Sequence, residues 1–495
     1  MRKNRMPSIK TLFPLGLVLL ALVVFIAPPT TGSQSRGQIY DVVLAGGRVI
    51  DPATGLDAIR NVGILNGKIA AISKSKLNGK EVLDVSGLVV APGFIDLHAH
   101  GQNVPSNTYQ LMDGVTTALE LEIGTYPLDV MKAREGKSLL NYGYSAGHTA
   151  ARRLVKKGDL QATNHQPLTQ DELNEMLSYL SKALDEGALG IGIGLDYVSR
   201  GVNDTELEAL FRLAAKRKVP VFIHIRMPDD RNDLTGLAEL LKMTEKTKAS
   251  FHMVHLVSTG LGRVPKFLQM IEAARAKGLD VTTEAYPYTA GSTGINSGIF
   301  DHDWQTKFGV SYDAIEWPPT GERFKDKAMW DDYRARYKNG TVIIHVMKEA
   351  WVEQALKHPL VMVASDGMPV MSLEERAHPR GRGCFTRVLG YYCREKKIIS
   401  LPEAIRKMTL MPAERLEKFA PAFKAKGRLT VGADADITIF DAEEVIDRAT
   451  YSDPNQFSKG IKQVLIGGTF VVRNEKLLDG VMVGKPLRAR MANKE

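Results

Sequence analysis

The sequence contains few cysteines and no long tract of one charge. Its 495 residues include two cysteines, Cys384 and Cys393, too few for a disulfide framework or a cysteine-rich metal site. Glycine (44) and proline (23) are scattered without a period, which excludes collagen-like and low-complexity chains. Hydrophobic residues make up 44% and charged residues 24%, so intrinsic disorder is excluded as well. The length suits a large α/β barrel with an accessory domain.

The charge balance is mildly basic, without a concentrated patch. The formal net charge is +9, but the first 33 residues contain four basic residues and no acidic one. The remainder has 61 basic and 56 acidic residues, with no run of five basic residues. Nucleic acid is therefore a poor candidate partner, and a small-molecule substrate is expected instead.

Residues 1–33 have the features of an export signal rather than of a folded segment. Basic residues occur within the first ten positions, residues 12–27 (LFPLGLVLLALVVFIA) form an uncharged apolar run, and a small, turn-prone stretch follows. This order is typical of a secretory signal peptide. The sequence predicts cleavage near Thr31 to Ser33, with a retained membrane anchor as the alternative. In either case we expect the protein to work outside the cytoplasm, in the periplasm or secreted.

The remaining chain divides into a small β domain and a long α/β region. Residues 34–92 and 425–495 contain alternating apolar positions, which in the first piece are bounded by Gly-Gly, Asn-Gly and Ser-Gly. This texture predicts short strands joined by tight turns. Because the two pieces flank the middle of the chain, we expect them to form one small β-sandwich domain from both chain ends.

Residues 93–424 alternate apolar β runs with amphipathic helical stretches. The helical stretches open with capping-type residues, as at Thr169 and Asp204. Eight such runs predict a (β/α)8 (TIM) barrel, in which catalysis takes place at the carboxyl ends of the strands. The runs are GFIDLHAH (93–100), GVTTALELEIG (114–124), ALGIGIGLDY (188–197), VPVFIHIRM (219–227), SFHMVHLV (250–257), LDVTTEAYPY (279–288), TVIIHVM (341–347) and PLVMVASDGMP (359–369).

Histidines and an aspartate occupy the ends of several runs. His98 and His100 are two residues apart on one strand, so both imidazoles point to the same side. His224, His255 and Asp366 end three other runs. Imidazole and carboxylate ligands together suit zinc. The sequence therefore predicts a metal-dependent barrel with one or two zinc ions at this rim.

Two glutamates on the second run are further candidate ligands. Glu120 and Glu122 share one face of an apolar strand, where buried carboxylates are costly unless they are paired or bind a metal. Glu122 is nearer the carboxyl end, so it is the preferred ligand and a candidate bridge between two ions. Glu120 is the second choice, and a salt bridge inside the barrel is the alternative.

Several motifs, in a fixed order, carry a resemblance to a known family. The first, APGFIDLHAH (91–100), resembles the opening strand of the amidohydrolase superfamily. Further motifs narrow the resemblance to one family within this superfamily. They are Gly147-His148 with the turn at 158–160, GLDY (194–197), EAYPYTAGST (284–293), SDGMP (365–369), HPRGRGCFTRVLG (378–390) and KMTLMPAERL (407–416). Together they resemble the N-acyl-D-amino-acid deacylase (D-aminoacylase) family, over about residues 38–480.

The resemblance implies a metal-bearing barrel and roles for individual residues. It implies metal ligands at His98, His100, His224 and His255. It implies that Asp366 is the catalytic general acid/base and, in some metal states, also a ligand. The carboxylate of the substrate is expected to contact Tyr286, Ser292 and Arg380.

The sequence departs from the family pattern at two positions. Members usually place a cysteine ligand just before the glycine that ends the second strand, where this chain reads Glu122-Ile123-Gly124. A carboxylate in place of the thiolate makes a harder site and favours a carboxylate-bridged metal pair. Many members also have a lysine two residues after the histidine of the sixth strand, where this chain has Val257. One cationic contact to the substrate is therefore missing.

The sequence thus predicts a zinc-dependent amidohydrolase that cleaves the linear amide of N-acyl-amino acids, in the leading hypothesis of D configuration. The alternatives among enzymes are dipeptide cleavage and cyclic-amide hydrolysis of the dihydroorotase or hydantoinase type. Cyclic-amide relatives usually bridge their metals with a carboxylated lysine on the fourth strand, and ALGIGIGLDY contains no lysine. A non-catalytic metal-binding scaffold is the remaining alternative, but it predicts eroded ligands, and the candidate ligands are present.

Overall fold

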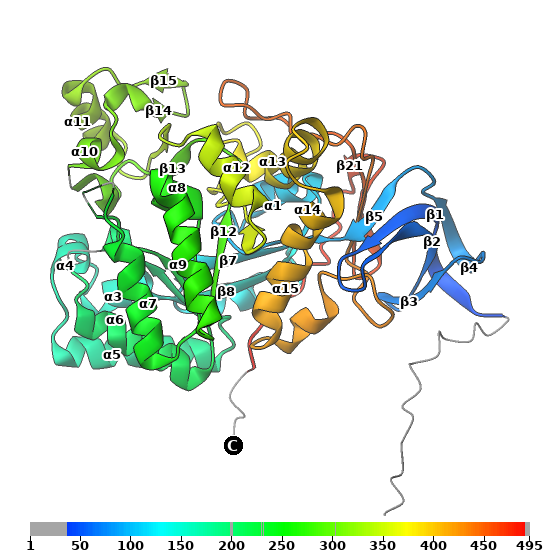
Figure 1. The fold of residues 1–495 in the computed structure, drawn as a ribbon, viewed down its shortest axis with the longest axis horizontal. Coiled ribbons are helices and arrows are strands. Elements are labelled where there is room, and N and C mark those ends of the chain that lie inside the picture. The colour runs from blue at the N-terminus through cyan, green and yellow to red at the C-terminus, as the bar shows by residue number, and fades with distance from the viewer. Residues whose placement is uncertain (1–36, 199–200, 229, 231, 302, 491–495) are drawn as a thin grey trace, which may run out of the picture. The chain divides into compact units, whose positions relative to one another are not determined.

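A computed structural model describes residues 37–490, apart from 199–200, 229, 231 and 302. The described residues from Ile39 onward form one compact unit (Figure 1). The expected export signal, with its apolar run and cleavage region, lies outside the described residues. Within the described part of the chain, no helix is long and apolar enough to cross a membrane.

A nine-stranded sheet joins the two ends of the chain. Its strands are β1 (Ile39–Asp51), β2 (Leu56–Leu65), β3 (Lys68–Ser73), β4 (Asn78–Asp84), β5 (Val89–Pro92), β18 (Ile437–Phe440), β19 (Ile461–Ile466), β20 (Thr469–Arg473) and β21 (Lys476–Leu477). The order is β21-β20-β19-β18-β5-β1-β2-β3, with β4 beside β1. Val42 and Leu44 belong to one apolar cluster and Val43 to another, as the alternation of a strand requires. The predicted small β domain from both chain ends is confirmed.

Eight parallel strands form the predicted barrel. They are β6 (Phe94–Asp96), β7 (Val115–Thr125), β8 (Asn141–Gly147), β9 (Ile191–Gly194), β10 (Val221–His224), β11 (Phe251–Met253), β12 (Val281–Ala285) and β17 (Val361–Val363), paired in that order. Hydrogen bonds just beyond β17 and β6 close the barrel. His100 N donates to Gly367 O, and Ser365 N donates to Asp96 Oδ1, both at 3.0 Å. The (β/α)8 architecture is therefore confirmed.

One of the eight predicted runs is not a barrel strand. TVIIHVM contains β16 (Thr341–Ile344), which pairs antiparallel with β13 (Gly291–Gly294) and β14 (Ile315–Trp317). The prediction was wrong because a strand buried in a separate antiparallel sheet has the same apolar texture as a barrel strand. The third barrel strand is instead β8, NYGYSAG. All seven of its residues are buried, but small and polar residues interrupt any apolar run.

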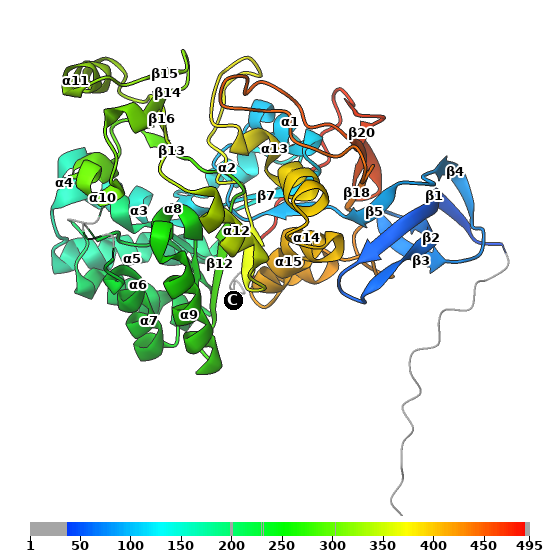
Figure 2. The same ribbon diagram turned by 45° about the horizontal axis from the view of Figure 1, so that its top comes forward.

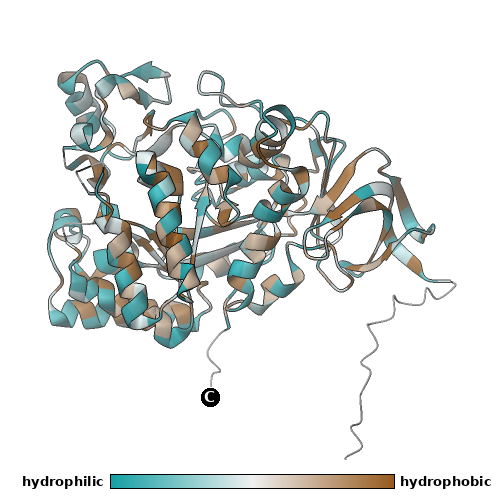
Figure 3. Cartoon of the chain, in the orientation of Figure 1, coloured by the Kyte–Doolittle hydropathy of each residue, from teal (hydrophilic) through white to brown (hydrophobic). Residues whose placement is uncertain are grey.

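Helices lie around the barrel strands, and one of the two predicted caps is at its expected residue. They are α1 (Val104–Met112), α2 (Asp129–Ala133), α3 (His148–Val155), α4 (Leu160–His165), α5 (Gln170–Asp185), α6 (Asp204–Arg217), α7 (Thr235–Thr247), α8 (Leu256–Gly260), α9 (Val264–Ala276), α12 (Glu349–Lys357), α13 (Arg380–Arg387), α14 (Leu401–Met408) and α15 (Leu410–Glu417). Thr169 and Glu172 form a capping box at the start of α5, whereas Asn203, one residue before the expected Asp204, caps α6. Apolar and polar residues alternate along α7 and α9, as in amphipathic helices (Figure 3).

An insertion separates β12 from β17 in the sequence. It contains β13, α10 (Trp304–Phe308), β14, β15 (Glu322–Arg323), α11 (Lys327–Arg336) and β16. Figure 2 shows β14, β15 and β16 grouped with α11. Aromatic packing stabilises this group, since the Trp330 ring lies 4.9 Å from Phe300 and 5.1 Å from Phe324 between centroids. The insertion also supplies one wall of the pocket beside the predicted ligands.

Candidate metal centre

The predicted ligands lie at or just beyond the carboxyl ends of five barrel strands. They are His98 and His100 after β6, Glu122 in β7, His224 at the end of β10, His255 after β11 and Asp366 after β17. All are buried except His100, which is partly exposed. His255 and Asp366 have φ angles of 33° and 51°, a left-handed backbone that non-glycine residues rarely adopt and that is concentrated at functional sites.

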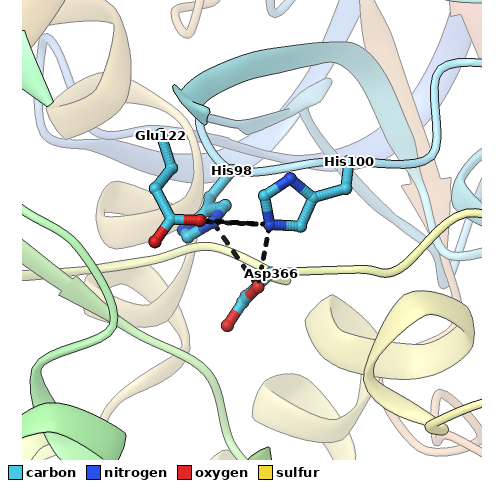
Figure 4. A group of neighbouring side chains, drawn as sticks. All are labelled: His98, His100, Glu122 and Asp366. Atoms are coloured by element: carbon cyan, nitrogen blue, oxygen red, sulfur yellow. Dashed lines mark hydrogen bonds and ion pairs between the residues drawn. The ribbon is translucent and has the colours of Figure 1, made fainter. Parts of the chain in front are cut away.

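Glu122 contacts four of the predicted histidine ligands, and Figure 4 shows it beside His98, His100 and Asp366. Its Oε2 is 3.1 Å from His98 Nε2 and 3.2 Å from His100 Nε2. Its Oε1 is 3.1 Å from His224 Nδ1 and 3.1 Å from His255 Nε2. The two oxygens thus face two sets of side chains. These are named the four-residue cluster (His98, His100, Glu122 and Asp366) and the three-residue cluster (Glu122, His224 and His255).

In the four-residue cluster, the atoms that converge are electron-pair donors. His98 Nδ1 is 2.7 Å from Glu284 Oε1, and His100 Nδ1 is 2.7 Å from Glu120 Oε2. When each Nδ1 carries the hydrogen, each Nε2 is available for a metal. Asp366 Oδ1 lies 3.4 and 3.3 Å from these two Nε2 atoms. Two imidazole nitrogens and two carboxylate oxygens at such distances could hold a metal ion, and this donor set fits zinc.

The three-residue cluster offers two imidazoles and the other oxygen of Glu122. His255 Nδ1 lies 2.9 Å from Thr259 Oγ1, while its Nε2 faces Glu122. His224 Nε2 is buried and has no hydrogen-bond partner among the described residues. The Tyr197 ring packs against His224 with 4.7 Å between centroids. Among the described residues, neither imidazole of this cluster is hydrogen-bonded to a carboxylate other than Glu122. The three-residue cluster is therefore less anionic than the four-residue cluster.

The pKa shifts differ between the clusters. Burial acts to lower the pKa of His98, but the carboxylates around it, Asp366 foremost, raise that pKa well above its usual value. At His255, burial and the neighbouring His224 lower the pKa. Burial acts to raise the pKa of Asp366, yet Arg380 and the neighbouring histidines together keep that pKa below its usual value. Asp366 is therefore ionised at neutral pH in this environment.

A pocket of about 450 Å³, including space open to solvent, lies beside both clusters and is lined by Asp366 together with the predicted carboxylate-binding residues. Arg380 is buried, and its Nη1 pairs with Asp366 Oδ2 at 2.8 Å. Its guanidinium carbon lies 4.6 Å from the centre of the Tyr286 ring, and its Nη2 donates to Ser292 O at 3.2 Å. The structure thus brings Tyr286, Ser292 and Arg380 together beside the predicted ligands.

Glu120 and Glu122 have different surroundings although they are two residues apart. Glu120 contacts the outer nitrogen of His100, and its Oε1 accepts a hydrogen bond from Ile123 N at 3.2 Å. The pairing of β7 with β8 shifts register between Glu120 and Thr125. Gly124 has a φ of +62° there, and an added Cβ would lie 2.3 Å from a serine hydroxyl, so the irregularity requires glycine. Glu122, the preferred ligand, is the glutamate that faces both clusters.

Two buried residues behind His98 were missed by the sequence analysis. Glu284 contacts His98 through Oε1, and its Oε2 lies 3.0 Å from His252 Nε2. His252 Nδ1 in turn lies 2.7 Å from Thr282 Oγ1. Burial acts to raise the pKa of Glu284, but the two histidines lower it to about 2. The available signal was a polar residue within each of two apolar runs; Glu284 also opens the motif EAYPYTAGST, but the motif assigns no role to it.

The structure shows the surroundings of both departures from the family pattern. No cysteine belongs to either cluster among the described residues, and the buried Cys384 directs its thiol to Ala364 O at 3.5 Å. Val257 is buried in α8 and supplies no charge. Among the described residues that line the pocket, Arg380 is the only arginine or lysine.

A parallel eight-stranded barrel with histidine–carboxylate clusters at its carboxyl end defines a metal-dependent hydrolase of the amidohydrolase type. Residues 321–472 match the model of an amidohydrolase family. The chain is 32% identical to an N-acyl-D-glutamate deacylase of Alcaligenes xylosoxydans xylosoxydans, with 87% of this chain and 93% of the relative covered. It is 30% identical to a D-aminoacylase of the same organism, with 92% and 99% covered. Dihydroorotases are more distant, one from Streptococcus pneumoniae being 26% identical over 463 residues.

Solved structures give the same relationship. The crystal structure of an N-acyl-D-glutamate deacylase from Bordetella bronchiseptica, complexed with zinc and a phosphonate inhibitor, has a TM-score of 0.77 at 29% identity. The match covers 91% of this chain and 100% of the other. The chain therefore belongs to the N-acyl-D-amino-acid deacylase (D-aminoacylase) family of the amidohydrolase superfamily. It is a hydrolase that acts on carbon–nitrogen bonds other than peptide bonds.

Proposed function

We propose that this protein uses zinc to hydrolyse the linear amide of N-acyl-D-amino acids, releasing a carboxylate and a free amino acid. The observation that carries the proposal is Glu122, which faces two ligand clusters beside a pocket containing a buried arginine. The zinc in the related deacylase, bound together with a mimic of the tetrahedral intermediate, supports both the metal and the reaction. We propose two zinc ions per chain, which the four-residue and three-residue clusters would hold, with Glu122 available to both.

Asp366 is the proposed general acid and base. Zinc held by these residues would lower the pKa of water to about 7 and polarise the amide carbonyl. Asp366 Oδ1 faces the four-residue cluster, while Oδ2 is held by Arg380 on the pocket side. From this position the carboxylate can take a proton from the attacking water and then deliver it to the leaving nitrogen.

Arg380 recognises the carboxylate of the substrate. Its planar guanidinium can bind a carboxylate through two hydrogen bonds, and Tyr286 and Ser292 line the same pocket with hydroxyl groups. A bound substrate carboxylate shares Arg380 with Asp366. That sharing weakens the Arg380–Asp366 pair and makes Asp366 a stronger base when substrate is present.

The rest of the pocket favours an apolar substrate side chain or acyl chain. Its wall is formed by Met227, Ile299, Phe308, Ile344 and Val346. A carboxylate side chain placed against this wall loses hydration without a second arginine or lysine to pair with. We therefore propose that the substrates are N-acyl derivatives of apolar amino acids rather than of acidic ones.

The location proposed for this activity is outside the cytoplasm. The support is the apolar run at 12–27, preceded by basic residues and typical of a signal peptide. Amino-terminal sequencing of the protein recovered from the periplasm or medium checks the proposal. A chain that keeps its first residues and stays in the cytoplasm contradicts it.

A hydrolysis screen combined with metal analysis tests the proposed function. The screen offers matched N-acetyl-D- and N-acetyl-L-amino acids, both apolar and acidic, with dipeptides and dihydroorotate as competing classes. We expect two zinc ions per chain and release of free amine from the apolar D-substrates. Turnover limited to dipeptides or cyclic amides would contradict the deacylase assignment. Absence of metal and of turnover after zinc reconstitution would contradict both parts of the proposal.

A further inference from the structure

A buried row of polar groups leads from the four-residue cluster into the barrel interior. Both carboxylate oxygens of Glu284 have a histidine partner. His98 Nδ1 lies 2.7 Å from Oε1, and His252 Nε2 lies 3.0 Å from Oε2. His252 continues the row to the hydroxyl of Thr282 at 2.7 Å. Glu284 is 1% exposed and His252 0%, so water does not compete for the contacts of Glu284 with the two histidines.

His100 has a similar arrangement on the other side of the cluster. Glu120 Oε2 is 2.7 Å from His100 Nδ1, and Glu120 Oε1 accepts hydrogen bonds from Ile123 N and Gly124 N at 3.2 and 3.4 Å. The backbone of the β7 irregularity therefore fixes the carboxylate that faces His100. Thus both imidazoles of the four-residue cluster meet a carboxylate at Nδ1.

A carboxylate behind an imidazole has two effects on metal binding. It accepts the Nδ1 hydrogen, which selects the tautomer with a lone pair on Nε2 and fixes the plane of the ring. Its negative charge also makes the imidazole a stronger electron donor. Removing such a partner typically reduces metal affinity by about 10–100-fold.

We propose that Glu284 and Glu120 are positioning residues for the four-residue cluster. This inference rests on the metal centre of the proposed function. Each holds the outer nitrogen of one histidine so that both Nε2 atoms converge on the same ion. His252 keeps Glu284 in place by donating Nε2–H to its second oxygen. Neither glutamate is among the described residues that line the substrate pocket.

Metal titration of the full-length apo-protein tests this proposal without use of a substrate. Zn²⁺ affinity is measured against a competing chelator, and Co²⁺ absorption reports the ligand geometry. The variants are E284Q, E120Q and E284D, each checked by thermal unfolding without metal. The control is E316Q, because Glu316 is a buried glutamate that holds His345 Nε2 at 2.9 Å in the insertion sheet, outside both clusters.

We expect E284Q and E120Q to weaken the tighter Zn²⁺ site by about 10–100-fold and to change the Co²⁺ spectrum. E284D, which keeps the charge, should recover part of the affinity, and E316Q should bind like the wild type. If folded E284Q and E120Q bind Zn²⁺ as tightly as the wild type, the proposal is overturned. If E284Q does not fold, E120Q and E284D decide the question. A wild-type protein that binds no metal at all instead overturns the proposed function.

Discussion

The two clusters share Glu122 but differ in what lies behind their histidines. In the four-residue cluster each imidazole meets a carboxylate, Glu284 or Glu120, at its outer nitrogen. In the three-residue cluster His255 meets the hydroxyl of Thr259, and His224 Nε2 has no partner among the described residues. The four-residue cluster also includes Asp366.

This difference teaches that one bridging carboxylate can connect two sites of unequal strength. More anionic ligands, and imidazoles with carboxylate partners, increase affinity for a divalent cation. We therefore expect the four-residue cluster to hold the first zinc ion more tightly than the three-residue cluster holds the second. Because Glu122 belongs to both clusters, the two binding events are linked.

Replacement of Glu122 removes the ligand that both clusters share and has the largest expected effect. We expect Glu122→Ala to bind fewer than two zinc ions and to lose activity by more than about 10³-fold, because metal polarisation of the substrate is worth several kcal/mol. Steady-state kinetics and metal analysis provide the measurements. Glu316→Gln is the control for loss of a buried carboxylate, and full activity of Glu122→Ala would refute the bridging role.

Asp366→Asn separates proton transfer from metal binding. We expect kcat to fall by about 10²–10⁴-fold, the usual contribution of a general acid or base. The other ligands remain, so at least one zinc ion per chain should be retained. The measurement is turnover of an apolar N-acetyl-D-amino acid by zinc-loaded protein. Near-normal kcat would remove Asp366 as the acid/base.

Matched histidine variants compare the clusters directly. His100→Ala should lose the tighter of the two zinc-binding steps, whereas His255→Ala should lose the weaker one and retain the tighter. Stepwise Zn²⁺ titration of each apo-protein distinguishes these outcomes, with the folded state checked by circular dichroism. Loss of the same step in both variants would show that the clusters do not act as distinct sites.

Arg380→Ala has the smallest expected effect on metal binding and a larger one on substrate binding. A charge-assisted hydrogen-bonded pair contributes about 1.5–3 kcal/mol, so KM should rise by roughly 10–100-fold. Zinc content should be unchanged because Arg380 is not a ligand in either cluster. Kinetics over a range of substrate concentrations provide the measurement, and an unchanged KM would refute contact with the substrate carboxylate.

Much of the fold and the residues of the metal centre could be predicted from local patterns. His98 and His100 are recognisable because residues two apart on a strand share a face, and strand-end positions group His224, His255 and Asp366. The pattern failed at β8, where small and polar residues are buried, and at β16, where an apolar run belongs to another sheet.

The residues behind the ligands could not be predicted, for physical reasons. Glu284 and His252 act through His98 and come from different strands, so no sequence spacing connects them. The distinct positions of Glu120 and Glu122 depend on the irregularity near Gly124, because a regular strand would place both glutamates on one face. Such roles become apparent when the strands are arranged in space.

Glu122, as the proposed ligand shared by two metal ions, is the central residue of the site. Zinc-edge anomalous diffraction from crystals of the zinc-loaded protein tests this most directly. We expect two anomalous peaks, one beside Glu122 Oε2 with His98 and His100, and the other beside Oε1 with His224 and His255. A zinc peak that does not contact Glu122, or the absence of a peak at either cluster, would contradict the account.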